Sequence, residues 1–420
     1  MTTGTAPATG PEPTARLSRA AFLAVLVAAL GYFVDIYDLL LFSIVRTRSL
    51  KAIGVPPEQL LDQGVFLINM QMIGLLLGGI FWGVLGDKRG RLSVLFGSIV
   101  TYSLANIANA YVTTVPEYAF WRFVAGVGLA GELGAGITLV AETLGKRARG
   151  YGTTVVAGVG LSGAVVGALV ANSVDWTTAY KIGGGLGLAL LALRVGVFES
   201  GLYQKAKGRS DVALGNFFAL FSSRARVQRY LAIIAVGVPI WFSIGILVSF
   251  SPEIGKALGM TPAPDAAKAV MWAYAGLAVG DLSSGALSQA VKSRKRSLLV
   301  FLLLTVLTVA VYFLVGPTSL VVFYAVCSAL GFANGYWAVF VTVASEQFGT
   351  NLRATATTTV PNFVRGAVVP LSLSFKSLST TGLGVSGAAL VVGAVSLGLA
   401  FLGLYALEET YGKDLEYFET

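Results

Sequence analysis

Ionisable side chains lie inside apolar stretches of this chain, where burying charge is costly enough to mark a functional site. Asp35 and Asp38 occur in "VDIYDLL", three residues apart, so they share one face of a helix. Two carboxylates this close repel each other when both are charged, so one of them can bind and release a proton near neutral pH. The chain has no histidine, so we expect carboxylates to carry any proton that it handles.

Deep charges also occur late in the chain. Asp281 lies in the apolar stretch 267–290, and Arg365 lies about 18 Å into the stretch 354–377, near the bilayer centre. A central arginine can clamp a carboxylate through two parallel hydrogen bonds, unless Asp281 neutralises it as a structural pair. Residues that could line the same substrate site, or simply pack between helices, are Asn69, Gln71, Trp241, Asn334, Tyr336, Trp337 and Asn362.

The composition places these residues in a lipid bilayer. Hydrophobic residues make up 55% of the 420 residues, charged residues 12%, and the mean hydropathy is +0.76, which excludes an ordinary soluble domain. Apolar runs of helical length predict an all-α membrane protein with twelve transmembrane helices. The predicted spans are 20–45, 62–86, 92–113, 117–143, 150–172, 179–198, 229–250, 267–290, 297–315, 318–345, 354–377 and 382–406.

Basic residues cluster in alternate connections between these spans, as in "KRGR", "GKRARG", "KAKGRS" and "KSRKR". Because basic loops stay on the cytoplasmic side, both termini are predicted to be cytoplasmic. Each cluster is short and adjoins a span, so the net charge of +9 needs no nucleic-acid partner to explain it. The stretch "RTRSLK" (46–51) is basic on the predicted external side and is an exception to this rule.

The chain is predicted to contain two repeated halves. "AETLGKRARGYGTTV" (141–155) aligns without gaps with "SEQFGTNLRATATTT" (345–359). A match at the same place in two six-helix halves is typical of a duplicated transporter, whose substrate site lies between the repeats. The predicted parts are a disordered cytoplasmic tail (1–19), a six-helix bundle (20–198), a cytoplasmic linker (199–228), a second six-helix bundle (229–406) related to the first by pseudo-twofold symmetry, and a cytoplasmic tail (407–420).

"GVLGDKRGRL" (83–92) resembles the loop between the second and third helices of the major facilitator superfamily, and "RFVAGVGLAGELGAG" (122–136) is also in register with that family. The resemblance extends over essentially the whole chain. It implies cytoplasmic charge clusters that latch the outward-open state and part when the cytoplasmic side opens; the alternative is that these charges only hold the loops at the membrane surface. The residues assigned to this cytoplasmic gate are Gly83, Asp87, Gly90, Arg91, Glu142, Arg149, Glu346 and Arg353. The second-half counterpart, "AVKSRKRSL" (290–298), lacks the aspartate and the glycines, so the latch should be asymmetric.

Proton coupling is also assigned by resemblance, here to the proton-coupled sugar porters and the metabolite:proton symporters. Asp38 matches their helix-one aspartate and Arg122 their helix-four arginine, which act as a protonation switch; a permanent structural ion pair is the alternative. Glu132, in "GELGAG", resembles an element of the carboxylate symporters, although helix packing explains it equally well. The proton-coupling residues are therefore predicted to be Asp35, Asp38, Arg122 and Glu132.

No cofactor, metal or catalytic site is predicted. The single cysteine, Cys327, rules out a cysteine-rich metal site. "GVGLAG" (126–131) fits the dinucleotide-binding pattern, but it lies inside an apolar helix with no preceding strand, so its glycines are expected to allow close helix contact. A Walker motif and a nucleophile with its base are both absent from the sequence, which argues against an ATP-driven pump or an enzyme.

These observations predict a secondary transporter that works by alternating access and imports a small organic anion, or another polar metabolite, together with protons. A proton-coupled sugar transporter is the main alternative; a proton-driven exporter and a non-transporting nutrient sensor are further ones. The protein is expected to be a monomer, to bind small-molecule substrate, protons and lipid but no nucleic acid, and to reside in a bacterial inner membrane.

Overall fold

The computed structural model describes residues 19–89, 91–131, 146–199 and 217–413, and all the regular structure within these ranges is helical. The first-half helices are α1 (Arg19–Ala52), α2 (Leu60–Arg89), α3 (Arg91–Asn109), α4 (Val115–Leu129), α6 (Lys146–Ser173) and α7 (Trp176–Glu199). The second-half helices are α8 (Arg224–Phe242), α9 (Ser251–Ala257), α10 (Ala266–Ala290), α11 (Arg294–Leu314), α12 (Leu320–Ala333), α13 (Trp337–Glu346), α14 (Thr350–Gly366), α15 (Val368–Ser379) and α16 (Gly384–Ala406).

Each of the twelve predicted spans contains a described helix, with ends that differ by several residues. Within the described ranges, seven stretches are long and apolar enough to cross a membrane by length and composition. Three of the predicted spans are not a single regular α-helix. Span 318–345 is interrupted between α12 and α13, span 354–377 is interrupted at Ala367, and α8 continues into a π-helical turn at Ser243–Val248.

The interruption between α12 and α13 has a local cause. The Asn334 side chain donates to the Leu330 carbonyl, at 2.8 Å, and to the Ser243 hydroxyl, at 3.0 Å. Such side-chain bonds compete with the regular backbone pattern of a helix. A Cβ atom at Gly335 would lie 2.5 Å from the Asp281 backbone nitrogen, so glycine lets this break lie directly against α10. Apolar composition alone gives no sign of such a break.

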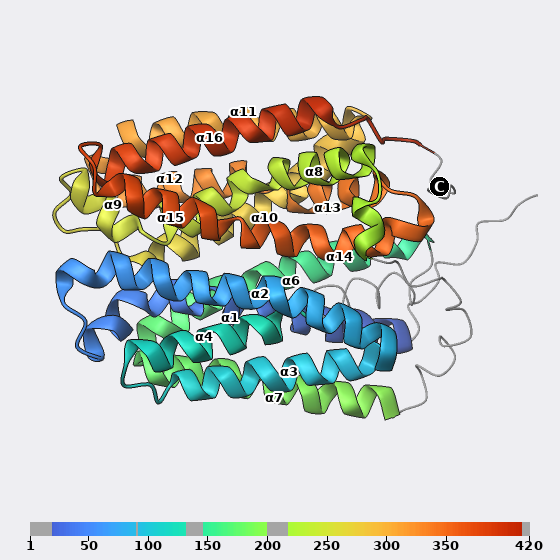
Figure 1. Ribbon diagram of the computed structural model, residues 1–420, viewed down its shortest axis with the longest axis horizontal. Helices are drawn as coiled ribbons and strands as arrows, with labels where there is room; N and C mark the ends of the chain where they lie inside the picture. The colour runs from blue at the N-terminus through green and yellow to red at the C-terminus, as the bar shows by residue number, and fades with distance from the viewer. Residues whose placement is uncertain (1–18, 90, 132–145, 200–216, 414–420) are drawn as a thin grey trace, which may run out of the picture.

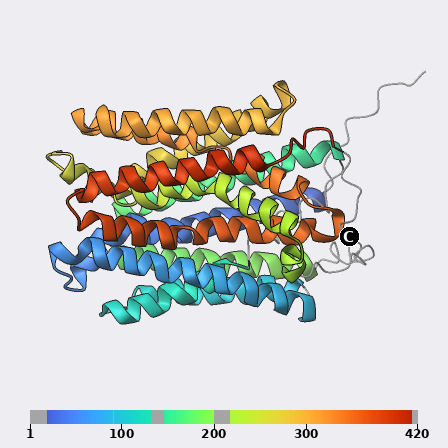
Figure 2. The ribbon, with the colours of Figure 1, turned by 45° about the horizontal axis from the view of Figure 1, so that its top comes forward.

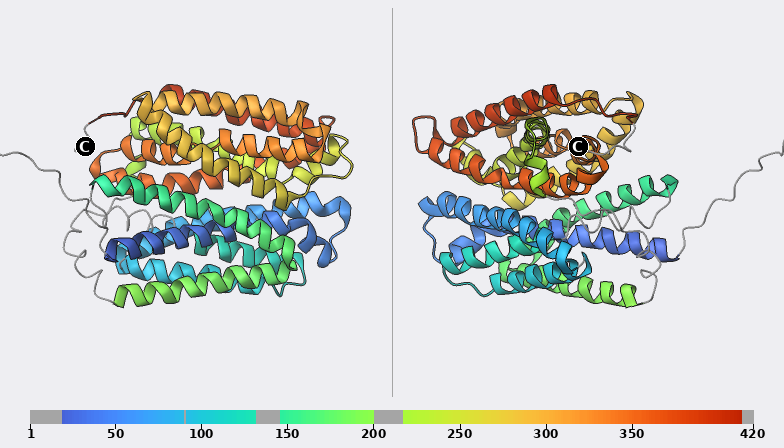
Figure 3. Two further views of the ribbon diagram at one scale, coloured as in Figure 1. Left: turned by 180° about the vertical axis from the view of Figure 1, so that it is seen from behind. Right: turned by 45° about the vertical axis from the view of Figure 1, so that its right-hand side comes forward.

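The helices form two groups that follow the order of the chain. Figure 1 shows α1 to α4, α6 and α7 together in one layer and α8 to α16 in the other. Figure 3 shows the same separation from behind and after a 45° turn, whereas in the view of Figure 2 the helices of the two groups overlap. The two groups touch where α6 meets α10, where α2 meets α14 and α15, and where α1 meets α10. Side chains on these helices therefore decide what the two halves can hold between them.

Small residues bring helices into close contact within each half. A Cβ atom at Gly126 of α4 would collide with the Gln71 carbonyl of α2, and one at Gly331 of α12 would collide with the Ala273 carbonyl of α10. Glycine is needed at both positions because the backbones approach too closely for any side chain. The first contact agrees with the packing role expected for "GVGLAG".

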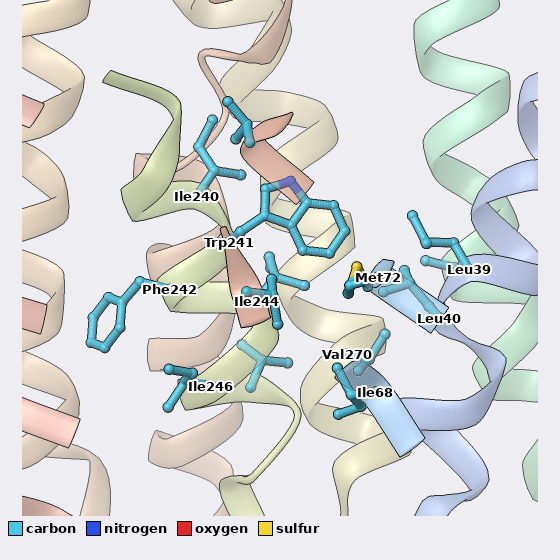
Figure 4. Packing of buried hydrophobic residues seen from close by; sticks show 14 of the residues in the cluster. Leu39, Leu40, Ile68, Met72, Ile240, Trp241, Phe242, Ile244, Ile246 and Val270 are labelled. Atoms are coloured by element: carbon cyan, nitrogen blue, oxygen red, sulfur yellow. The ribbon is translucent and has the colours of Figure 1, made fainter. Parts of the chain in front are cut away.

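An apolar layer joins the two halves. It consists of Leu40, Ile68 and Met72 from the first half, and Trp241, Ile244 and Val270 from the second, all of them buried. In Figure 4, Trp241 and Val270 lie on the side that faces Met72 and Ile68. Tight packing of such side chains excludes water from this part of the contact between the halves.

We call the end at which α1 begins and α16 ends the terminal end, and the other end, which carries residues 53–59 and 110–114, the opposite end (Figure 1). Residues 407–413, which belong to the predicted cytoplasmic tail, lie against the terminal ends of α11 and α13. Glu409 accepts from the Arg294 and Lys295 amides, at 2.9 and 3.2 Å, and Thr410 is buried. Carboxylates at a helix N-terminus satisfy amides that have no partner within the helix.

Candidate functional site

The first group of buried polar residues surrounds Asp38 on α1 and Arg122 on α4. Both side chains are fully buried. Arg122 donates from Nη2 to the Gln71 side-chain oxygen on α2, and its guanidinium lies 5.1 Å from the centre of the Phe42 ring. Gln71, which we expect in the substrate site, is thus the hydrogen-bond partner of this arginine.

Asp38 is placed by close packing. A Cβ atom at Gly183 of α7 would collide with an Asp38 carboxylate oxygen, so this glycine makes room for the carboxylate. Arg122 and Asn106 lie close enough to interact with it. Among the described residues, however, neither Asp38 oxygen has a hydrogen-bond partner, and no ion pair within 4.0 Å joins it to Arg122. The arrangement is therefore not a closed ion pair in this conformation.

The second group surrounds Arg365 on α14. This side chain is 4% exposed, and its guanidinium lies 5.8 Å from the centre of the Trp337 ring. Tyr32 of α1 and Tyr274 of α10 lie close enough to interact electrostatically with it. None of the ion pairs within 4.0 Å between described residues includes Arg365, and its Nε atom has no hydrogen-bond partner there. We call Arg365, Trp337, Tyr32 and Tyr274 the arginine group.

Asp281 does not neutralise Arg365 in this structure. Its Oδ1 atom accepts from the Ala338 backbone amide at 2.7 Å, and the Trp337 amide also faces its carboxylate. Asp281 thus satisfies the first turn of α13, which has no side-chain cap of its own. The structural-pair alternative to the arginine clamp is not seen.

Tyr32 connects the two groups. It interacts electrostatically with Arg365 and Asp281 of the second half and with Asp35 of its own helix. Asp35 is itself buried, one turn before Asp38. The proposed proton carriers and the arginine group are therefore neighbours across the contact between the two halves.

The other residues expected at the substrate site lie in contacts of different kinds. Asn334 bonds to Ser243, and the Tyr336 hydroxyl donates to the Val236 carbonyl at 3.0 Å, so both fasten the break in α12–α13 to α8 and its π-helical turn. The Asn69 side-chain oxygen accepts from the Ser372 hydroxyl at 2.7 Å, across the two halves. Trp241 belongs to the apolar layer (Figure 4), and Asn362 is buried on α14.

At the terminal end, Glu346 pairs with Arg294 at 3.2 Å and accepts from the Thr410 hydroxyl at 2.6 Å. Arg294 comes from "AVKSRKRSL", so the second-half counterpart of "GVLGDKRGRL" supplies a basic partner even though it lacks the aspartate. Arg353 lies on α14 near this cluster in sequence. Gly83, Asp87, Arg91 and Arg149 lie in helical backbone, while Gly90, Glu132 and Glu142 fall outside the described residues.

At the opposite end, the contacts of Arg46 explain one of the basic residues in "RTRSLK" (46–51), the stretch that is an exception to the rule for basic loops. It is fully buried and bonds to the Glu253 carboxylate at 2.7 Å and to the Ser249 carbonyl at 3.2 Å, both in the second half. The Phe250 ring centre lies 4.5 Å from its guanidinium. A second pair across the halves, Lys376 with Asp62 at 3.3 Å, is more exposed. We call Arg46, Glu253 and Ser249 the Arg46 latch.

Tyr32, Tyr274, Arg46 and Arg294 are not among the site residues predicted from the sequence. Tyr32 precedes Asp35 by three residues and Tyr274 precedes Asp281 by seven, so both lie on the faces of the deep charges, and this helical spacing was the available signal. In the sequence, Arg46 stands out only as a positive charge on the predicted external side. Its two partners in the Arg46 latch are more than two hundred residues away, and no local pattern indicates them.

Apolar helices in two groups, with buried charges where the groups meet, define a membrane transport protein. The family model of the Major Facilitator Superfamily matches residues 21–373, and the chain belongs to this superfamily. The expectation drawn from "GVLGDKRGRL" is confirmed.

Among similar proteins, the 3-(3-hydroxy-phenyl)propionate transporter of Escherichia coli is 27% identical over 368 residues, which cover 86% of this chain and 88% of the relative. The niacin transporter NiaP of Acinetobacter baylyi is 30% identical over 191 residues, covering 44% and 43%. The crystal structure of a D-xylose-proton symporter matches 94% of this chain and 99% of its own, with a TM-score of 0.69 and 17% identity. This last likeness shows the fold. Together, the family and the relatives show an integral membrane transporter of metabolites and not an enzyme.

Proposed function

We propose that this protein is a proton-coupled symporter for a small aromatic monocarboxylate. The observation that carries the proposal is Arg365, a buried guanidinium without a carboxylate partner among the described residues, in contact with the Trp337 ring. An unneutralised buried cation is costly, so an anionic ligand that pairs with it gains binding free energy. Arginine presents its donors in a fork that matches a carboxylate.

The aromatic part of the proposal rests on what surrounds the guanidinium. Trp337, Tyr32 and Tyr274 supply rings on three different helices, and aromatic faces pack well against an aromatic ligand. The named substrates of two relatives, niacin and 3-(3-hydroxy-phenyl)propionate, each combine a ring with a carboxylate. This shared chemistry favours an aromatic acid over a sugar.

Proton coupling is proposed for Asp38, with Arg122 as its switch. Asp38 is buried without a hydrogen-bond partner among the described residues, beside an arginine that Gln71 holds. When Asp38 is charged, Arg122 is drawn toward it; when Asp38 is protonated, Gln71 keeps the arginine. Asp35 and Tyr32 lie between this switch and the arginine group, so substrate and proton can influence each other at short range.

Alternating access follows from the contacts between the halves. We place the terminal end in the cytoplasm of a bacterium because the basic loops lie there, and the opposite end outside. The Arg46 latch and the apolar layer then close the external side, and they must part for substrate to enter. We take the working unit to be a monomer with the two halves as its moving bodies.

The first test is thermal stabilisation of the purified protein by niacin, 3-(3-hydroxy-phenyl)propionate, D-xylose and neutral amino acids, because a ligand that binds only the folded state raises its melting temperature. The aromatic acids should stabilise the wild type, Arg365→Ala should lose this response, and Arg365→Lys should retain part of it. Stabilisation by D-xylose alone would support the sugar transporter. Stabilisation of Arg365→Ala by the acids would refute the clamp.

A further inference from the structure

We propose that Asp281 is a positioning residue. It holds Trp337 beside Arg365 by capping α13, and it acts neither as the counter-ion of the arginine nor as a proton carrier. This inference deepens the proposed function and rests on it, because it concerns how the aromatic wall of that same substrate site is held in place.

The start of α13 needs a cap because the predicted span 318–345 is interrupted between α12 and α13. α12 ends at Ala333 and α13 begins at Trp337, so the first amides of α13 have no preceding helical turn to accept from them. The residue before α13, Tyr336, provides no side-chain cap. Asp281, from α10, accepts from Ala338 at 2.7 Å. A carboxylate also stabilises the positive end of a helix electrostatically.

The cap determines where Trp337 lies because Trp337 is the first residue of α13. Gly335 lies directly against the backbone of Gly280 and Asp281, which fixes the break on α10. Asn334 and Tyr336 fasten the other side of the break to Ser243 and to the Val236 carbonyl. With both sides fixed, the direction of the first turn of α13 depends on its amides reaching Asp281.

Trp337 then supports the guanidinium. Its ring centre lies 5.8 Å from the Arg365 guanidinium carbon and 5.4 Å from the Phe340 ring, which lies one turn further along α13. An aromatic face attracts a cation without using its N–H donors. The donors of Arg365 therefore stay available for a ligand carboxylate, which they would not be if Asp281 had paired with them.

The two roles of Asp281 predict different effects of two substitutions. Asparagine keeps an oxygen that can accept from Ala338 but has no charge and cannot carry a proton, whereas alanine keeps neither property. For a positioning residue, Asp281→Asn should keep KM for labelled niacin or 3-(3-hydroxy-phenyl)propionate within about 3-fold of the wild type. Asp281→Ala should raise KM by about 5- to 30-fold, the range that corresponds to losing a helix cap, with a smaller change in the maximal rate.

Backbone hydrogen exchange of residues 334–340 gives a second readout that needs no substrate. Asp281→Ala should speed exchange of the Ala338 amide, and Asp281→Asn should leave it close to the wild type, because exchange reports whether that hydrogen bond is formed. If Asp281→Ala does not fold, Asp281→Asn alone still decides between the roles. Trp337→Leu should then reproduce the rise in KM without faster exchange at Ala338.

Three results would overturn the inference: Asp281→Asn as defective as Asp281→Ala, which would indicate a charged or proton-carrying role; a normal KM in Asp281→Ala; or unchanged exchange in Asp281→Ala. If neither aromatic acid binds the wild type, the proposed substrate class fails. The exchange measurement then still tests the cap, so the two failures can be told apart.

Discussion

The Arg46 latch offers a sharp test of how the two halves are held closed at the opposite end. Its arginine side chain is 0% exposed and its Glu253 partner 18% exposed, so the pair is largely shielded from water. Arg46→Gln removes the charge but keeps a donor that can reach a carbonyl. If the latch holds the halves together, this change should favour the conformation in which the opposite end is open.

The size of the effect follows from the burial of the pair. Removing one partner of a fully buried ion pair costs about 3–5 kcal/mol; because Glu253 is partly exposed and glutamine keeps one hydrogen bond, we expect about 2–3 kcal/mol here, or a change of about 30- to 150-fold in the conformational equilibrium. Glu253→Gln should have a similar effect. Lys376→Gln is the matched control: its pair with Asp62 is 38% and 48% exposed, and such pairs contribute about 0–1 kcal/mol.

The opening of this end can be measured by cysteine labelling, because the chain has a single native cysteine to remove. Replacing buried Cys327 by alanine gives a cysteine-free background, into which Ile68→Cys places one thiol in the apolar layer of Figure 4. A membrane-impermeant maleimide added on the side of the opposite end should label this thiol slowly in the wild type. Labelling should be about 30- to 150-fold faster with Arg46→Gln, because the rate follows the population of the open conformation.

Two outcomes would refute this reasoning. If neither Arg46→Gln nor Glu253→Gln speeds labelling of Ile68→Cys, the latch does not control closure. If Lys376→Gln speeds labelling as much as Arg46→Gln does, the effect comes from loss of positive charge at that end and not from the buried pair.

Two further predictions concern the proton switch and the terminal end. Asp38→Asn should abolish accumulation of substrate driven by a pH gradient while leaving substrate exchange measurable, since only the proton carrier is lost; uphill accumulation by this variant in vesicles would show that the proton is carried elsewhere. Burial raises the pKa of Glu409, but hydrogen bonds from the Ser293 hydroxyl and from the amides of Tyr411, Arg294 and Lys295 outweigh it, so its pKa is below its usual value. A lowered folded-state pKa stabilises the fold above the ordinary glutamate pKa of about 4.3 and ceases to do so as the pH falls through the folded value. The melting temperature of Glu409→Ala should therefore fall below that of the wild type at pH 7, by an amount equivalent to about 1 kcal/mol, and the difference should shrink below about pH 4; a difference that does not depend on pH would contradict this.

Much of the fold could be predicted because its signals are local. Long apolar runs, basic connections and the motif at 83–92 identify the spans and the family without knowledge of any tertiary contact. The glycines of "GVGLAG" could be assigned to packing for the same reason. Helix interruptions could not be predicted in this way, since the break at Asn334 depends on a bond to Ser243, which is 91 residues away.

The candidate site was harder to predict because the identity of a buried charge does not reveal its partner. Asp281 and Arg365 are both buried, but the sequence could not show that Asp281 bonds to a backbone amide and not to the guanidinium. Nor could the sequence show that Gln71, predicted to line the substrate site, accepts a hydrogen bond from Arg122. In both cases the choice depends on side-chain geometry across helices, which is fixed only when the two halves have folded.

The docked residues 407–413 have a consequence for biogenesis. Glu409 caps the amides at the start of α11, and it is synthesised 115 residues after Arg294. Glu346 likewise gains its hydrogen bond from Thr410 only after Thr410 has been synthesised. During synthesis, α11 and α13 must therefore enter the membrane with their terminal ends incomplete. If synthesis stops or the chain is cut before Glu408, every membrane span is present but the terminal ends of α11 and α13 lack these hydrogen bonds. A quality-control protease could recognise a protein in that state.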